Sequence, residues 1–136
     1  MEVVERVDVT RSGGINGDHR GTIRPGGTGK RQVTVMERRD WEAAIDEIGV
    51  ALPWAARRVN LLADEIDLPQ VAGTRLRVGR DVLLEITVEC DPCRRMDEVV
   101  NGLQAALRPD WRGGICTRVL AGGSIAVGDE IRIEEP

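Results

Sequence analysis

Apolar and polar residues alternate along several short stretches of the chain, and this pattern predicts β-strands. The clearest stretch runs from Val82 to Val88, where every second residue is aliphatic, and it ends at Cys90. Leu76 and Val78 form a shorter stretch just before it. The same reasoning predicts further strands over residues 3–9, 31–36, 115–120, 124–127 and 130–133.

Two other stretches carry their apolar residues at helical spacing. Over residues 41–48 they recur at i, i+3, i+4 and i+7, which predicts a helix with Asp40 as its N-cap. The same spacing over residues 96–107 predicts one continuous second helix that ends before Pro109. Residues 53–63 fit a helix or a strand equally well.

About seven strands, two or more helices and many glycine turns, without regular alternation of strand and helix, predict a mainly β fold with helical insertions. We expect an α+β arrangement in which the strands form a closed or partly closed β-barrel. The length of 136 residues fits a single domain over residues 1–136.

Composition excludes several classes of function. The chain has no Phe or Tyr, only three Trp and a net charge of −4, so we expect no nucleic-acid partner.

No apolar run reaches about eighteen residues and no secretory signal is visible, so we expect no membrane partner. An odd number of cysteines, three, suits a reducing cytoplasm. Lys30 is the only lysine, which makes a Schiff base with pyridoxal phosphate unexpected in this chain.

The sequence Cys90-Asp-Pro-Cys93 carries the most reactive side chains. Its place between a strand and a helix matches a thioredoxin-type redox site locally, but that fold expects the motif early in a regular series of strands and helices. A structural zinc site needs about four ligands, and the three cysteines and His19 show no paired spacing. The plain alternative is that Cys90 and Cys116 pack as small hydrophobic residues, and we expect this for Cys116.

A glycine-rich stretch over residues 12–30 has no apolar period and predicts an irregular loop. It is not a P-loop, because Arg24 stands where the first glycine is required and Arg31 follows Lys30. Its amides and basic side chains can bind a phosphate or another oxyanion. The alternative is a surface loop with solvated charges.

An ordered set of short motifs resembles one family. It resembles the MOSC domain, the C-terminal module of molybdenum cofactor sulfurases that also occurs as a standalone bacterial protein, from about Val3 to Ile133. The motifs are Gly17-Asp18, Arg31 to Thr34, Arg58-Val59-Asn60-Leu61, Asp67-Leu68, Gly73 to Gly79, Pro92-Cys93, Arg112-Gly113-Gly114-Ile115 and Arg118-Val119-Leu120.

The resemblance implies a MOSC barrel, of the pyruvate-kinase-barrel-like type, that binds the molybdenum cofactor, which is molybdenum held by molybdopterin. The family's cysteine falls on Cys93, which implies that this thiol coordinates molybdenum or carries sulfur. Arg94, Arg95 and a helix N-terminus would favour its thiolate form. Cys90 is then a secondary thiol with an open role, such as protecting or resolving an oxidised Cys93. The positions implied in cofactor binding are Gly17, Asp18, His19, Arg58, Asn60, Arg112, Gly113 and Gly114.

Three functions follow as hypotheses. The first is a cytoplasmic domain that holds sulfurated cofactor, or transfers it, to a partner molybdoenzyme, with a desulfurase as a further candidate partner. The second is a small molybdoenzyme that reduces N-hydroxylated compounds with electrons from a partner reductase. The third is a thiol redox or interaction domain without cofactor. The sequence leaves open whether the chain is an enzyme, such as a sulfur transferase or an oxidoreductase component.

Overall fold

The computed structural model describes residues 5–15, 29, 31–57 and 59–134. Within these residues the strands form two sheets, of order β2-β1-β8 and β4-β3-β7-β6-β5-β9. All neighbouring strands are antiparallel except β3 and β4. The strands are β1 (Arg6–Thr10), β2 (Gly14–Ile15), β3 (Val33–Glu37), β4 (Leu61–Ala63), β5 (Arg75–Val78), β6 (Val82–Glu89), β7 (Ile115–Ala121), β8 (Gly123–Ala126) and β9 (Ile131–Glu134).

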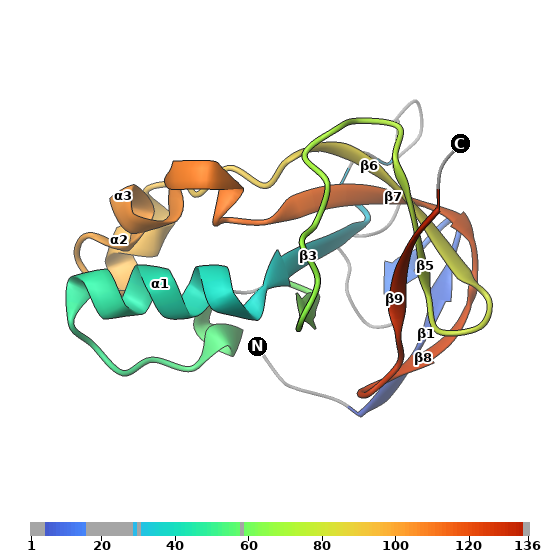
Figure 1. Cartoon of the computed structure of the whole chain (residues 1–136), viewed down its shortest axis with the longest axis horizontal. Coiled ribbons are helices and arrows are strands. Elements are labelled where there is room, and N and C mark those ends of the chain that lie inside the picture. Colours follow the sequence, from blue (N-terminus) through green and yellow to red (C-terminus); the bar gives the residue numbers. More distant parts are fainter. Residues whose placement is uncertain (1–4, 16–28, 30, 58, 135–136) are drawn as a thin grey trace.

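The six-stranded sheet curls into half a barrel, and the three-stranded sheet lies at one end of its long strands β6 and β7 (Figure 1). The helices gather at the opposite end. They are α1 (Arg38–Ile48), α2 (Arg95–Val99) and α3 (Leu103–Leu107), with two short 3-10 helices, η2 (Trp54–Arg57) and η3 (Pro109–Trp111). The expected fold class, mainly β with helical insertions in a partly closed barrel, is confirmed. Two strands of two and three residues, β2 and β4, bring the number of described strands above the seven expected.

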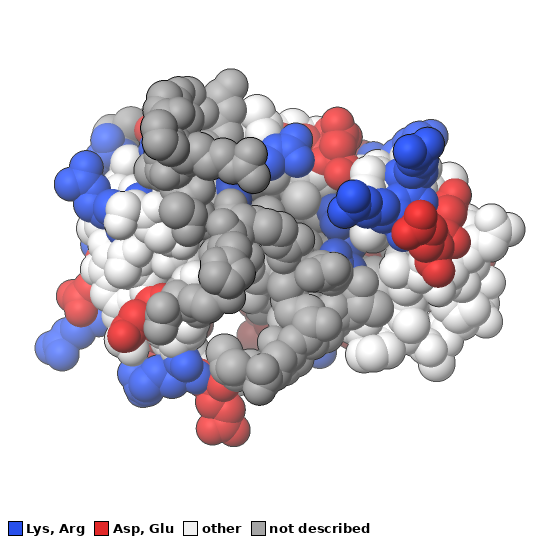
Figure 2. All heavy atoms as spheres, turned by 180° about the vertical axis from the view of Figure 1, so that it is seen from behind, with Lys and Arg blue, Asp and Glu red and all other residues white. Residues whose placement is uncertain are grey.

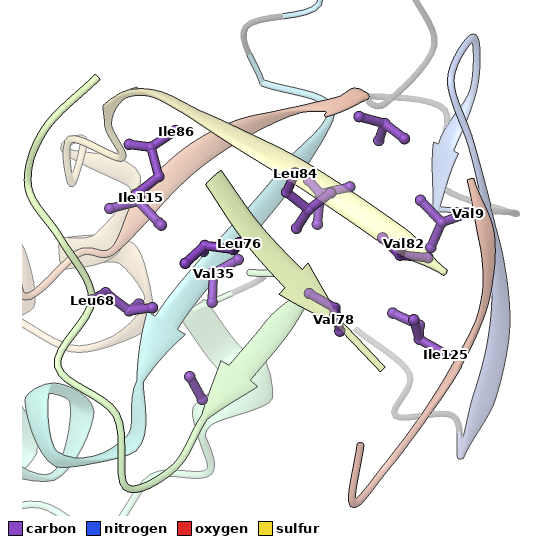
Figure 3. Close-up of a cluster of buried hydrophobic side chains, with 13 residues drawn as sticks. Val9, Val35, Leu68, Leu76, Val78, Val82, Leu84, Ile86, Ile115 and Ile125 are labelled. Carbon is purple, nitrogen blue, oxygen red and sulfur yellow. The ribbon is translucent and has the colours of Figure 1, made fainter. Parts of the chain in front are cut away.

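The inner face of the barrel is filled with aliphatic side chains from both sheets (Figure 3). Leu76, Leu84 and Ile86 are at most 1% exposed, as the alternating pattern predicts for inward positions. Val9 of β1 and Ile125 of β8 close the end of this core. Burial of these side chains is the main stabilising contribution to the barrel, because each removes apolar surface from water.

A second apolar cluster joins the helices to the end of β3. Met36 is buried there with Trp41 and Ala44 of α1 and with Leu103 and Leu107 of α3. The Trp41 indole N–H donates to the carbonyl oxygen of Leu52 at 3.0 Å, which ties the chain after α1 to this cluster. This cluster fixes the helical end of the molecule relative to the sheet.

The helix predicted to start after Asp40 begins earlier, at Arg38, and its N-cap is Glu37. Strand β3 therefore runs directly into α1, and the N-cap expectation is wrong. The carboxylate of Glu37 takes part in two contacts that fix this junction. It accepts from Arg39 Nε at 2.7 Å and from the Leu68 N–H at 3.3 Å. Asp40 lies instead in the first turn of the helix.

The single helix predicted over residues 96–107 is two short helices, α2 and α3. Val100 is extended and Gly102 has a φ of 93°, which is a conformation that favours glycine. Despite the break, the apolar side chains of both helices lie on one side, and Met96, Leu103 and Leu107 pack in one buried cluster.

The remaining expectations lie close to the observed elements. Residues 53–63, ambiguous in sequence, contain η2 and then β4. Of the glycine-rich stretch, the described residues 12–15 and 29 include β2, and residues 16–28 and 30 lie outside the described part.

No helix in the described residues is long and apolar enough to cross a membrane. On the face shown in Figure 2, basic and acidic side chains are interspersed.

Candidate functional site

The two thiols of the Cys90–Cys93 motif occupy different environments. Strand β6 ends at Glu89, and the Cys90 N–H continues its ladder by donating to the Gly114 carbonyl oxygen at 2.9 Å. Cys90 is buried, with 9% of its surface exposed, whereas Cys93 is exposed. The Cys93 carbonyl accepts from the Met96 N–H at 2.9 Å and so starts the turn into α2. With five residues, α2 offers little of the dipole that a long helix provides.

A buried arginine, Arg57, holds the segment that leads to Cys93. Its Nη2 lies 3.2 Å from the Cys90 carbonyl oxygen, 3.1 Å from the Gly113 carbonyl oxygen and 3.4 Å from the Cys90 sulfur. The residue is only 7% exposed, and its Nε is buried with no hydrogen-bond partner in the described part of the chain. Among the described residues, no carboxylate lies within ion-pair distance of this guanidinium. Its charge therefore faces neutral carbonyl groups and one sulfur.

Cys116 of β7 completes this arrangement from the neighbouring strand. Its thiol is fully buried and donates to the Glu89 carbonyl oxygen at 3.9 Å. The interaction with the Cys116 thiol, together with the positive charges of Arg57 and Arg31, lowers the pKa of the Cys90 thiol, although burial opposes the shift. The same interaction and burial raise the pKa of Cys116. Of the two thiols, Cys90 is therefore the one whose ionised form is favoured.

The turn before β7 packs directly against the thiol segment. A Cβ at Gly113 would lie 2.5 Å from the Cys90 carbonyl oxygen and 3.3 Å from Cδ of Pro92. Gly114 has a φ of 98°, and a Cβ there would overlap the backbone of Val35 in β3. The two glycines therefore allow this turn to fit between β3 and the residues that precede Cys93.

The Arg112 side chain points toward the helices. Its Nη1 donates to the Ala106 carbonyl oxygen at 3.0 Å and forms an ion pair with Glu47 of α1 at 2.9 Å. Of the predicted cofactor positions in this turn, Gly113 thus lies beside the thiol segment, whereas the guanidinium of Arg112 lies against α1 and α3.

Asn60 is connected to the thiols through Thr34. Its Oδ1 accepts from the Thr34 N–H at 2.9 Å and from the Thr34 hydroxyl at 3.2 Å. Thr34 and Cys116 are register partners between β3 and β7, so their side chains lie on the same face of the sheet. Asn60, Thr34, Cys116 and Cys90 therefore form a row across this face. The other predicted positions, Gly17, Asp18, His19 and Arg58, lie outside the described residues.

Sequence reasoning missed Arg57. The family motif drew attention to its neighbour Arg58, and nothing in the local pattern marks one residue of an arginine pair as buried. A buried arginine is rare because it needs hydrogen-bond partners inside the protein. The partners of Arg57 are 33 and 56 residues away in sequence, so no local pattern could reveal them.

The arrangement combines an exposed thiol, Cys93, with a buried thiol three residues earlier, Cys90, whose sulfur contacts a buried guanidinium. No group of three or more Cys, His, Asp or Glu side chains among the described residues can enclose a metal ion. The exposed thiol of Cys93 is a soft sulfur ligand that lies within reach of a bound group.

Comparisons with known proteins agree on one family and one fold. The family model described as "MOSC domain" matches residues 16–132. No curated protein matches the chain. Among solved structures, the YuaD protein from Bacillus subtilis is 19% identical, with a TM-score of 0.77 over 98% of this chain and 86% of that one.

Two further structures are similar. YiiM from Geobacillus stearothermophilus is 18% identical with a TM-score of 0.73, and YiiM from Escherichia coli is 17% identical with a TM-score of 0.72. Each match covers 98% of this chain, but only 62% and 64% of the respective YiiM chains. The chain thus spans less than two thirds of both YiiM proteins. At these identities the likeness concerns the fold.

Proposed function

Because the chain belongs to the MOSC domain family, we propose that it binds the molybdenum cofactor and uses the exposed thiol of Cys93 to coordinate molybdenum or to carry sulfur for a partner molybdoenzyme. The observation that carries this proposal is the contrast within the thiol motif. Cys93 is exposed, while the residues before it are fixed by Arg57 and by the Gly113 turn. A ligand thiol has to be accessible on a segment held in place.

The residues present fit the cofactor. A cysteine sulfur is a soft ligand, as molybdenum requires. The buried Nε of Arg57 has no hydrogen-bond partner in the described part of the chain, and the positive charge of this side chain suits an environment that receives an anionic group. Asn60 lies in the same row as the thiols and has an amide that can bind polar ring edges. When bound, the cofactor supplies a metal centre with an exchangeable sulfur ligand.

In this proposal the chain's own residues have separate roles in binding the cofactor. Cys93 holds the metal or the sulfur at the surface. Arg57 orients the segment before Cys93 through the carbonyl oxygens of Cys90 and Gly113. Asn60, together with Asp18 and Arg58 from the family motif, binds the pterin and its phosphate in this proposal, whereas Arg112 fixes the turn before β7 against α1 and α3.

The test is purification of the full chain from a molybdenum-replete host that makes the cofactor, followed by metal analysis and pterin fluorescence. We expect molybdenum and pterin in the wild-type protein and loss of molybdenum from Cys93→Ala. Cys116→Ala is the matched control, because its thiol is fully buried on a neighbouring strand and it should retain molybdenum. Absence of both molybdenum and pterin from the wild-type protein would overturn the proposal and leave a cofactor-free thiol domain.

The same loaded protein separates a carrier from an oxidoreductase. Reduction of benzamidoxime with a chemical electron donor, dependent on Cys93, would identify a molybdoenzyme for N-hydroxylated compounds. Transfer of cofactor to an apo-molybdoenzyme without such reduction identifies the carrier, which is the outcome we expect.

A further inference from the structure

In the proposed binding of cofactor Arg57 positions the segment before Cys93, and the thiol of Cys90 itself has no role. Arg57 is buried with no carboxylate partner among the described residues, and a buried unpaired cation is costly. Among the described residues, the Cys90 sulfur, at 3.4 Å from Nη2, is the one group in contact with this nitrogen that can become an anion, since the other two contacts are carbonyl oxygens.

We propose that Cys90 is a second sulfur site of this domain: a nucleophilic thiolate that accepts one sulfane sulfur atom from a small persulfide or polysulfide. The inference deepens the proposed function and rests on it for the class of chemistry, which is sulfur transfer. It assigns that chemistry to a residue other than the exposed Cys93.

A buried guanidinium stabilises the anion that this chemistry needs. Arg57 supplies a positive charge and a hydrogen-bond donor directed at the Cys90 sulfur at 3.4 Å. Cys116, on the adjacent strand, donates its thiol to the Glu89 carbonyl oxygen at 3.9 Å, and its interaction with Cys90 also lowers the pKa of the Cys90 thiol. A persulfide anion on Cys90 would be stabilised by the same guanidinium.

The transfer step balances without an added oxidant or reductant. The Cys90 thiolate attacks the outer sulfur of a donor R–S–SH, and a new S–S bond forms while the donor's S–S bond breaks. The donor thiolate R–S⁻ leaves with the electron pair of that bond. The proton on the transferred sulfur then passes to R–S⁻, which leaves a Cys90 persulfide anion and R–SH. The number of sulfane sulfur atoms is unchanged.

Burial decides which donor fits. Cys90 exposes 9% of its surface, enough for a small inorganic or low-molecular-weight donor but too little for the thiol of another folded protein. Cys93, which is exposed, is the thiol suited to a protein partner. The two cysteines would then serve donors of different size.

The experiment uses reduced, metal-free and cofactor-free full-length protein, treated with inorganic polysulfide without oxygen and then freed of excess reagent. Both thiols lie between Arg80 and Arg94 and share a tryptic peptide, so single substitutions assign the sulfur. We expect Cys93→Ser to retain one added sulfur atom, measured by intact mass and by thiocyanate released with cyanide. The double variant Cys90→Ser/Cys93→Ser should carry none, and this comparison assigns the retained atom to Cys90, while Cys90→Ser alone reports any sulfur that loads on Cys93.

The role of the neighbours is tested in the Cys93→Ser background. Replacing Arg57 with Gln should slow sulfur loading several-fold at neutral pH, because the thiolate loses its positively charged neighbour and becomes rarer. Cys116→Ala removes only a buried thiol next to Cys90, and it should also slow loading several-fold in a protein whose circular dichroism is unchanged. That second variant keeps the test valid if the arginine variant does not fold.

Other outcomes overturn the inference. If the treated Cys93→Ser protein carries no added sulfur, Cys90 does not accept sulfur directly from the donor. This conclusion holds whether the wild-type protein loads sulfur on Cys93 alone or transfers it from Cys93 to Cys90. Because the assay contains no metal or pterin, its result is independent of cofactor binding. A protein that loads sulfur on Cys90 but never copurifies with molybdenum would overturn the proposed function and leave this inference standing.

Discussion

One nitrogen of the Arg57 guanidinium contacts both the backbone and the side chain of Cys90. Nη2 lies 3.2 Å from the Cys90 carbonyl oxygen and 3.4 Å from its sulfur. The same nitrogen reaches the carbonyl oxygen of Gly113 at 3.1 Å. A single buried side chain therefore joins η2, the end of β6 and the turn before β7, and it supplies the charge that favours a thiolate at Cys90.

Replacing Arg57 with Gln should lower the free energy of unfolding by about 2 to 3 kcal/mol, because two buried carbonyl groups and the Cys90 sulfur lose their donor. Urea unfolding monitored by tryptophan fluorescence measures the change. The control is Arg38→Gln, which breaks an ion pair with Asp64 whose side chains are 50% and 62% exposed. That change should cost less than about 1 kcal/mol. Equal costs for the two variants would contradict the structural role of Arg57.

Gly113→Ala tests the close approach of the turn to the thiol segment. The added Cβ would lie 2.5 Å from the Cys90 carbonyl oxygen, so backbone has to move, and we expect a loss of about 1 to 3 kcal/mol in the free energy of unfolding. Gly13→Ala is the matched control, because its Cβ meets only the Thr10 hydroxyl, at 2.9 Å, on a side chain that can rotate. A Gly113 variant as stable as the Gly13 variant would show that the turn is not tightly packed.

Alkylation of Cys90 should reach its full rate at a lower pH than alkylation of an ordinary cysteine. The interaction with the Cys116 thiol and the charges of Arg57 and Arg31 lower the pKa of this thiol, and the thiolate is the reactive form. The rate with iodoacetamide, followed by mass spectrometry in a Cys93→Ser background, should therefore rise with pH and level off at a lower pH than for a free cysteine. In Cys116→Ala the midpoint should move to higher pH. A midpoint that stays in place in this variant would remove Cys116 as the main cause.

The strands and the fold class could be predicted because their signal is local. Alternation over residues 82–88 depends only on which face of one strand is buried, and Leu84 and Ile86 are buried as that pattern requires. The break between α2 and α3 was missed because Gly102 leaves the apolar period intact while changing the backbone direction. The spacing of apolar residues shows which face of a segment is buried, but it does not show where the helix is briefly interrupted.

The candidate site was predicted less completely, for a different physical reason. A reactive cysteine is visible in the sequence, so Cys90 and Cys93 stood out, but their division into a buried thiolate and an exposed thiol depends on contacts across strands. Arg57 and Cys116 come to Cys90 from η2 and β7, and no local pattern records such pairings. The environment of a side chain, more than its identity, sets its pKa and its accessibility.

Asp40→Asn should stabilise the protein at neutral pH and not in acid. Burial, and then the nearby charge of Glu37, raises the pKa of the Asp40 carboxyl from 3.8 to about 6. The folded protein thus holds this proton more tightly than the unfolded chain does, so ionisation of Asp40 lowers stability progressively as pH rises from about 4 through 6. The amide cannot ionise, and the partly exposed position limits the gain to about 1 kcal/mol at pH 7.5.

Urea unfolding of Asp40→Asn and wild type at about pH 7.5 and about pH 4 measures this difference, with the gain expected only at the higher pH. Glu42→Gln is the control, because Glu42 is exposed in the same helix and its replacement should change stability by less than about 0.5 kcal/mol at either pH. If Asp40→Asn destabilises at pH 7.5, the carboxylate contributes favourably to the first turn of α1, and the unfavourable burial inferred for it is wrong. If it stabilises equally at both values, the gain does not come from removing an ionisable group.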